Sequence, residues 1–240
     1  TGTGSPAPLG NEHPEAHHQP GEERLMMKSI AKCCATVALA LTLASPAMGA
    51  SPTSRADKTA KNMLKMENAL KQGVAQLDSI IASLNSLSTA QGSDLVSHYT
   101  EFSKQVEEMN STAKKVKSKA EKAQAQREDY LKAWKKDQGK IQNEQLKQAS
   151  ESRRAELEPF IKQITEGLSS ASQNFTPLLQ NLNDLNLFLG NDLSTHGFAS
   201  AQDLISECNK STEIVKQDVE KANEGLRNLA ASITPGGTAK

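Results

Sequence analysis

Apolar residues recur at alternating intervals of three and four positions over most of the chain beyond residue 60. Four segments carry this spacing: Met63 to Leu87, Leu95 to Trp134, Leu157 to Leu189, and Phe198 to Ile233. The last series consists of Phe198, Ala201, Ile205, Cys208, Thr212, Val215, Val219, Ala222, Leu226, Leu229 and Ile233. A repeat of about 3.5 residues held this long is typical of α-helices that supercoil left-handedly around one another.

Short polar or glycine-containing breaks separate these segments. Thr89 to Gly92 lies between the first and the second, Gly190 to Gly197 lies between the third and the fourth, and Pro235 follows the last. Short connections favour antiparallel neighbours. The sequence therefore predicts an all-α fold, an elongated antiparallel four-helix bundle with coiled-coil (heptad) packing over residues 51–234, followed by a disordered tail at 235–240.

The two ends of this bundle have different contents. We expect the loops at residues 88–93 and 190–197 to share one end. The connection at 135–156 then lies at the opposite end, together with both termini of the domain. Each segment spans roughly 25 to 40 residues, so each helix is expected to be about 40 to 60 Å long.

Two prolines interrupt the third segment. A proline removes one backbone hydrogen bond from a helix and usually kinks it. The heptad keeps its phase through Pro177, which predicts a kinked but continuous helix there. Pro159 instead fits the first turn of a helix, with residues 140–156 forming a separate or bent piece.

The second segment has two further features. Three of its seam positions are small, which predicts close approach of a partner helix: Ala113, Ala120 and Ala123. It also carries a lysine cluster from Lys114 to Lys122, which flanks the seam. Such a cluster is either a solvated helix face or a patch for an anionic envelope surface. The tip at 132–156 is mildly basic as well, with seven basic and four acidic residues.

Residues 27–50 have the pattern of a secretory signal peptide. Two lysines form a short basic start, an apolar run covers residues 33–44, and small residues precede a cleavage point near Gly49 or Ala50. The run is shorter than the roughly 20 residues that span a bilayer, which disfavours a membrane anchor. No cysteine follows near the cleavage point, so a lipid anchor is not expected either. We expect the mature protein in the periplasm or secreted.

Residues 1–26 precede this signal, although a signal peptide normally begins a protein. We expect translation to start at Met26 or Met27, because Gly21-Glu22-Glu23 can be encoded by a purine-rich stretch that resembles a ribosome-binding site. With a start at Met27, residues 1–26 would be an upstream extension that is not translated. The alternative is a disordered polar segment. N-terminal sequencing of the cellular protein separates the two.

Charge and composition narrow the classes of partner. The chain has 28 Lys and Arg against 28 Asp and Glu, and aromatic residues make up 3% of it. A net charge of zero and few stacking side chains disfavour nucleic acid as a partner. Cleavage after the signal would leave Cys208 alone, so no intramolecular disulfide is expected.

The candidates for chemistry are few. His98 and Glu101 lie three positions apart on one helix, but the paired Glu-x-x-His motifs of di-metal bundles are missing. We expect His98 on a polar surface, His196 in a loop, and Cys208 packed in the core, with an intermolecular disulfide as the alternative for Cys208. We therefore expect no catalytic, cofactor-binding or metal-binding residues, no cofactor and no small-molecule substrate.

Several short motifs lie near the expected helix ends. They are Gly92-Ser93-Asp94-Leu95 with Tyr99, Trp134, Ser152-Arg153-Arg154, Phe175-Thr176-Pro177-Leu178-Leu179, Asp184, Leu187-Phe188-Leu189 and Asp192-Leu193. On these motifs the chain resembles an uncharacterised bacterial family catalogued as domain of unknown function 2959. The resemblance implies an exported long-helix protein, often a lipoprotein, and implies no activity. This chain departs from the family by lacking a lipidation cysteine and by having Lys135 and Lys136 where the family tends to be acidic.

These observations favour an exported, non-enzymatic helical protein. We expect a structural or protein-interaction module of the bacterial envelope, which binds a protein partner or itself through helix faces or the 135–156 tip. The alternative is a membrane-active adaptor or pore-former. Its best insertion segment, Phe175 to Leu193, contains Asn181, Asn183, Asp184 and Asn186, which argue against insertion. A metal-dependent enzyme is the third hypothesis.

Overall fold

The computed structural model describes residues 51–92 and 94–236. The expected extension at 1–26, the expected signal peptide at 27–50 and the end of the tail at 237–240 lie outside the described residues. Regular structure in the described part consists of helices alone. They are α2 (Pro52–Thr89), α3 (Asp94–Gln138), α4 (Glu144–Ala155), α5 (Glu158–Asn191) and α6 (Thr195–Ile233).

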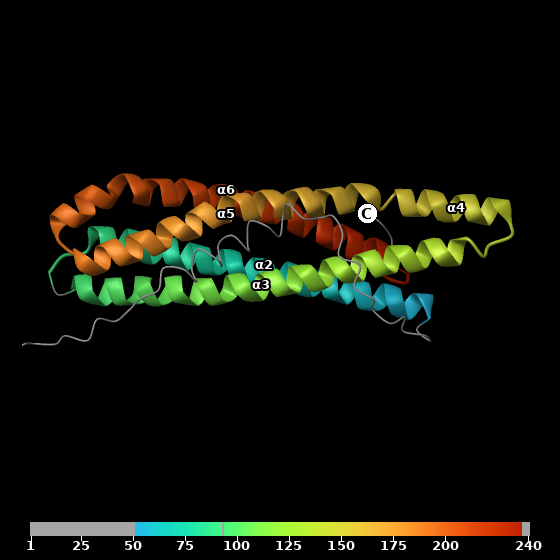
Figure 1. Ribbon diagram of the computed structural model, residues 1–240, viewed down its shortest axis with the longest axis horizontal. Coiled ribbons are helices and arrows are strands. Elements are labelled where there is room, and N and C mark those ends of the chain that lie inside the picture. Colours follow the sequence, from blue (N-terminus) through green and yellow to red (C-terminus); the bar gives the residue numbers. More distant parts are fainter. Residues whose placement is uncertain (1–50, 93, 237–240) are drawn as a thin grey trace, which may run out of the picture.

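The four long helices form an elongated antiparallel bundle, as Figure 1 shows. The α2–α3 and α5–α6 connections share one end, and α4 lies at the other with the start of α2 and the end of α6. The prediction of an all-α antiparallel four-helix bundle is confirmed. Left-handed supercoiling, which the heptad spacing indicates, stays a prediction.

Residues 140–156 form a separate piece, as the sequence predicted. Asn143 caps α4 by accepting a hydrogen bond from the Leu146 backbone nitrogen at 3.0 Å. Pro159 lies in the first turn of α5, where its missing N–H needs no partner within the helix. Pro177 lies inside α5, which continues through it, so the predicted continuity is confirmed.

The other helix boundaries also follow local chemistry. Ser51 caps α2 through its hydroxyl, which accepts from the Ser54 backbone nitrogen at 3.2 Å, and Ser194 caps α6 in the same way. Gly92 has a φ of 63° in the connection between α2 and α3. That left-handed conformation favours glycine, because it carries no Cβ.

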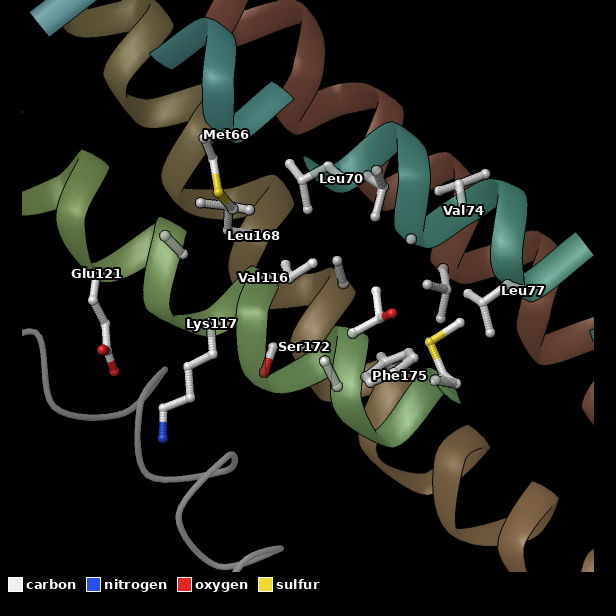
Figure 2. A pocket seen from close by; sticks show the side chains of 18 of the residues that line it. Met66, Leu70, Val74, Leu77, Val116, Lys117, Glu121, Leu168, Ser172 and Phe175 are labelled. Atoms are coloured by element: carbon white, nitrogen blue, oxygen red, sulfur yellow. The ribbon is translucent and has the colours of Figure 1, made fainter. Parts of the chain in front are cut away.

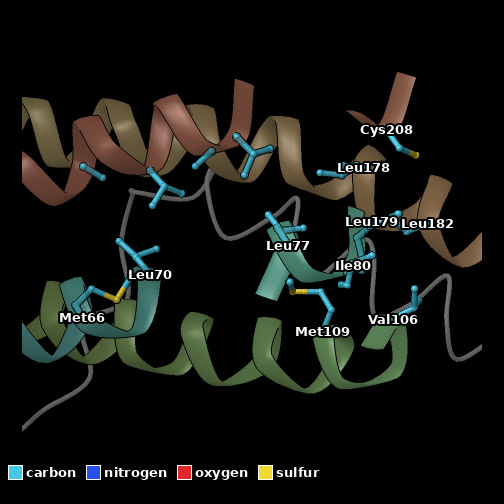
Figure 3. Packing of buried hydrophobic residues seen from close by; sticks show 14 of the residues in the cluster. Met66, Leu70, Leu77, Ile80, Val106, Met109, Leu178, Leu179, Leu182 and Cys208 are labelled. Carbon is cyan, nitrogen blue, oxygen red and sulfur yellow. The ribbon is translucent and has the colours of Figure 1, made fainter. Parts of the chain in front are cut away.

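The core is built from the apolar seams of α2, α3, α5 and α6. Figure 3 shows part of this packing, with Ile80 of α2, Val106 of α3, Leu182 of α5 and Cys208 of α6. These four side chains are fully buried. Burying a side chain of this size stabilises the fold by about 1.5–3 kcal/mol. The seam of α3 is an exception, since beyond Met109 most of its apolar positions are only half-buried.

Two glycines allow α5 and α6 to pack backbone to backbone. A Cβ on Gly167 of α5 would lie 2.7 Å from the backbone nitrogen of Ala222 in α6. A Cβ on Gly225 of α6 would lie 2.8 Å from Cγ1 of Ile164 and 3.0 Å from the carbonyl oxygen of Phe160. Neither position has room for a side chain, so these glycines set the closeness of the two helices.

A buried carboxylate links α2 to α6. The Glu67 side chain is 7% exposed, and its Oε1 accepts from Lys71 Nζ at 2.7 Å and from Arg227 Nη1 at 3.1 Å. Burial raises the pKa of Glu67, but the hydrogen bonds from Lys71 and Arg227 outweigh burial and leave the pKa below its usual value. The folded protein therefore holds this carboxylate in its charged form.

Candidate functional site

Helices α3 and α5 touch at the loop end and separate further along. Near the loops, the Tyr99 hydroxyl donates to the carbonyl oxygen of Asn186 at 3.1 Å, and Asn110 Nδ2 donates to Asn183 Oδ1 at 3.0 Å. Of the four most extensive helix–helix interfaces, the one between α3 and α5 is the least closely packed. The space between them holds two cavities.

The larger cavity has a volume of about 220 Å³ and lies between α3 and α5, with α2 and α6 as its floor. Most of its lining is apolar, including Leu70, Val74, Leu77, Met109, Val116, Leu168, Phe175, Val215 and Val219. In Figure 2, the side chains of Leu70, Val116 and Phe175 surround the central space. Lys117 and Glu121 line the rim, and their side chains extend away from the space.

The second cavity, of about 150 Å³, lies next to the first. Both are lined by Met66, Ala120, Gln124 and Leu168, so the two are neighbours along the same helix pair. Together they follow α3 from Met109 to Arg127. The result is a long apolar interior on the loosely packed side of the bundle.

Arg127 is the cationic residue of the second cavity. Its side chain is half-buried, and it forms no hydrogen bond or ion pair with any residue in the described ranges. Burial lowers the pKa of the Arg127 guanidinium, and the charge of the adjacent Glu128 partly offsets that effect. The group stays protonated at neutral pH, because the ordinary pKa of an arginine side chain lies far above 7. A half-buried cation therefore lies at one end of an apolar space.

The predicted close approach at the small residues of α3 is wrong on the side that faces α5. Ala113, Ala120 and Ala123 line the cavities instead of contacting that helix closely. The physical reason is that α5 packs against α6, because Gly167 and Gly225 let those two helices approach closely. Arg127, a charged residue at a seam position of α3, is the signal in the sequence that could have pointed to this region.

Neither His98 nor His196 belongs to a group of three metal-ligating side chains in the described ranges. His98 is half-buried on α3 rather than fully on the surface, and Glu101 accepts a hydrogen bond from Gln105 Nε2 at 2.6 Å. His196 lies in the first turn of α6 and is exposed, so its expected place in a loop is corrected. Within residues 51–92 and 94–236, no three His, Cys, Asp or Glu side chains are grouped to hold a metal ion.

Cys208 is fully buried in the core, as predicted. Burial raises the pKa of its thiol to about 12, and the nearby Glu207 charge acts in the same direction. The thiol is therefore protonated at neutral pH. Since the thiolate is the reactive form, Cys208 is a packing residue.

The lysine cluster is mostly solvated. Lys114, Lys115, Lys119 and Lys122 are exposed, whereas Lys117 is half-buried at the rim of the larger cavity. The cluster thus divides into an exposed face and one residue beside the cavity.

The tip at the far end of the bundle combines the end of α3 with α4. No residue of α4 is buried, and Leu146 is 61% exposed. The tip is nevertheless tied down, because Trp134 Nε1 donates to Ser150 Oγ at 2.9 Å and Arg153 Nη2 donates to the carbonyl oxygen of Ser232 at 2.8 Å. It is an ordered, solvent-facing platform with an excess of basic residues.

Comparison with known proteins identifies a family without supplying an activity. The model of the family described as "Protein of unknown function (DUF2959)" matches residues 48–231. No curated protein and no solved structure matches the chain. None of the described helices combines the length and apolarity needed to cross a bilayer.

Proposed function

Since the chain belongs to the DUF2959 family, whose function is unknown, we propose from its structure that it is an exported, non-enzymatic interaction module of the bacterial envelope. The α3–α4 tip is the surface that binds its protein partner. The observation that carries this proposal is α4 itself, a helix without a buried residue that hydrogen bonds of Ser150 and Arg153 tie to α3 and α6.

The tip has the properties of a docking platform. An isolated 12-residue helix is marginal in water, so α4 depends on the anchors that Trp134 and Arg153 provide. Order of this kind lowers the entropy cost of binding, because the surface is already arranged. Leu146 offers an apolar anchor, and the surrounding basic residues favour an acidic partner surface.

The non-enzymatic part of the proposal rests on the state of the reactive side chains. Cys208 is buried with a raised pKa, and His98 and His196 belong to separate elements of the bundle. Elemental analysis of the purified protein tests this part. Stoichiometric zinc or iron would contradict it.

Photo-crosslinking in living cells tests the tip. A photoreactive amino acid replaces Leu146 on the tip or, as a matched control, Ile214, which is 47% exposed on α6. We expect a discrete crosslinked partner from position 146 and none from position 214. Equal crosslinking from both positions, or none from position 146, would sink the tip as the partner surface.

Export has a separate test. We expect the periplasmic or secreted protein to begin near Gly49 or Ala50, as measured by N-terminal sequencing. An uncleaved chain confined to the cytoplasm would contradict export without affecting the tip.

One observation favours the membrane-active alternative. Leu187 and Phe188 of α5 are 70% and 42% exposed, and Val96 of α3 is 63% exposed at the same end of the bundle. A vesicle leakage assay separates the two functions. Strong leakage that Leu187→Ser abolishes would favour the membrane-active protein over the interaction module.

A further inference from the structure

We propose that the two cavities between α3 and α5 form one binding site for a long-chain fatty acid. Its carboxylate binds Arg127, and its acyl chain extends along α3 toward Met109. This site is independent of the tip and goes beyond the interaction function.

The length of the space fits a single acyl chain. Met109 and Arg127 are eighteen positions apart on one helix, which corresponds to roughly 27 Å at 1.5 Å per residue. The acyl chains of one bilayer leaflet span about half of a 30 Å hydrocarbon core. An acyl chain that starts at Arg127 therefore remains inside the two cavities.

The volume and lining also fit. The combined volume of the two cavities falls within the range of about 300–1,000 Å³ that is usual for ligand sites. Spread along roughly 27 Å of α3, cavities of about 220 and 150 Å³ are too narrow for an α-helix, whose diameter with side chains is about 10–12 Å. A flexible chain of methylene groups fits a long apolar interior, and its burial is favourable by about 0.8 kcal/mol per methylene.

The charge at one end selects the head group. Arg127 has no hydrogen bond or ion pair within the described part of the chain, so its guanidinium can receive a ligand anion. A guanidinium binds a carboxylate through two parallel hydrogen bonds. These bonds are stronger in a partly buried site, because the local dielectric constant is lower than in water. The chain thus keeps a charged residue in an apolar seam where packing alone would favour leucine.

The edges of the site explain how a ligand enters. The α3–α5 side is the open side of the bundle, and the lining there includes Thr165, Ser169 and Ser172 of α5. Because the cavities lie between helices that are loosely packed, a small separation of α3 from α5 admits the ligand without breaking the close α5–α6 contact.

Calorimetric titration of the full chain tests the proposal with three probes, each kept below the concentration at which it aggregates. Hexadecanoate carries the anion, hexadecanol has the same chain without charge, and hexadecyltrimethylammonium reverses the charge. We expect saturable one-to-one binding of hexadecanoate, at least tenfold weaker binding of hexadecanol, and no binding of the cation. Equal affinity for hexadecanoate and hexadecanol would overturn the role of Arg127.

Variants locate the site. We expect Arg127→Gln to weaken hexadecanoate by about tenfold or more and to leave hexadecanol unchanged, as the loss of a charge-assisted hydrogen bond predicts. Lys122→Gln, on the exposed face of the same helix, is the matched control and is expected to bind like the parent. Unchanged hexadecanoate binding in Arg127→Gln would overturn the proposal.

Filling the space gives a second, independent result. Ala120 lines both cavities, so Ala120→Leu is expected to abolish binding of both hexadecanoate and hexadecanol. Circular dichroism checks that this variant folds, and Ser172→Leu replaces it if it does not. Retained binding in a folded, filled variant would overturn the site. So would a dimer in sedimentation analysis that Ala120→Leu converts to monomer, because a second copy would then cover the cavities.

Discussion

The α5–α6 and α3–α5 interfaces use small residues in opposite ways. At α5–α6, there is no space for a side chain at Gly167 or Gly225. The backbone at each glycine lies directly against the other helix. At α3–α5, Ala113, Ala120 and Ala123 border open cavities. Small residues therefore permit close approach but do not cause it. The partner helix must also be able to approach, and α5 cannot approach α3 along the cavities because it packs closely against α6.

This difference separates a closely packed interface from a cavity-lined one within the same bundle. A closely packed interface gains dispersion contacts along its whole length. The cavity-lined interface lacks those contacts, and its Arg127 has no hydrogen bond or ion pair within the described residues. Proteins commonly retain such unfavourable features where a ligand is bound.

The largest expected effect comes from filling the close interface. Gly167→Leu forces a side chain against the Ala222 backbone, where even a Cβ would lie 2.7 Å from the nitrogen. We expect a loss of about 3 kcal/mol in the free energy of unfolding, since overpacking typically costs 1–3 kcal/mol and backbone cannot yield. Urea denaturation measures it. A loss below about 1 kcal/mol would show that α5 and α6 are not closely locked.

Next is the buried carboxylate between α2 and α6. Arg227→Ala leaves Glu67 with Lys71 as its remaining charged partner, and we expect a loss of about 1–2 kcal/mol. The parent should also lose stability in acid. Because folding lowers the pKa of Glu67, its contribution is present above the usual value of 4.5 and is lost as the pH falls through the lowered pKa.

Denaturation curves of Glu67→Gln between pH 3 and 7 check that sign. The variant should lack the Glu67 part of the acid dependence, so the difference from the parent should shrink as the pH falls. A difference that grows toward low pH would contradict the charged state assigned to Glu67.

A glycine beside the cavity should respond in the opposite direction to Gly167. A Cβ on Gly73 would contact only Val116 Cγ2, at 3.9 Å, and Gly73 lies in the interior of α2. Gly73→Ala is therefore expected to stabilise the fold by about 0.5–1 kcal/mol through helix propensity. Thermal unfolding measures it, with Gly167→Ala as the matched destabilising control. If both variants moved in the same direction, the two interfaces would not differ in packing.

The smallest expected effect concerns Arg127. Replacing the half-buried cation with leucine removes a desolvated charge and adds apolar contact in the cavity, so Arg127→Leu should stabilise the fold by less than about 1 kcal/mol. Urea denaturation at neutral pH, without ligand, measures this change in the free energy of unfolding. A clear destabilisation would mean that Arg127 is a structural residue.

Much of the fold could be predicted from particular residues. The heptad positions predict the buried faces, Pro159 marks the start of α5, and the seam position of Cys208 predicts its place in the core. The predicted sharing of ends by the loops and α4 is also confirmed. These features depend on local pattern and on short connections, which a sequence displays directly.

The candidate site could not be predicted in the same way. Ala120 and Arg127 occupy seam positions of α3, but nothing in their spacing indicates a cavity rather than a close contact. His196 was placed in a loop, although Ser194 caps α6 so that the helix already includes it. The cavity depends on how closely α5 packs against α6 rather than α3. The start of α6 depends on which of several neighbouring residues caps the helix.

The sequence by itself determined the helices, their order, their antiparallel arrangement and the apolar face of each. Only the tertiary structure decided which faces meet closely and which remain apart. The physical reason is that a heptad pattern specifies the direction in which a helix buries its side chains but not the distance to the next helix. That distance depends on where two backbones can touch, which Gly167 and Gly225 allow at α6 and no residue pair provides between α3 and α5 along the cavities.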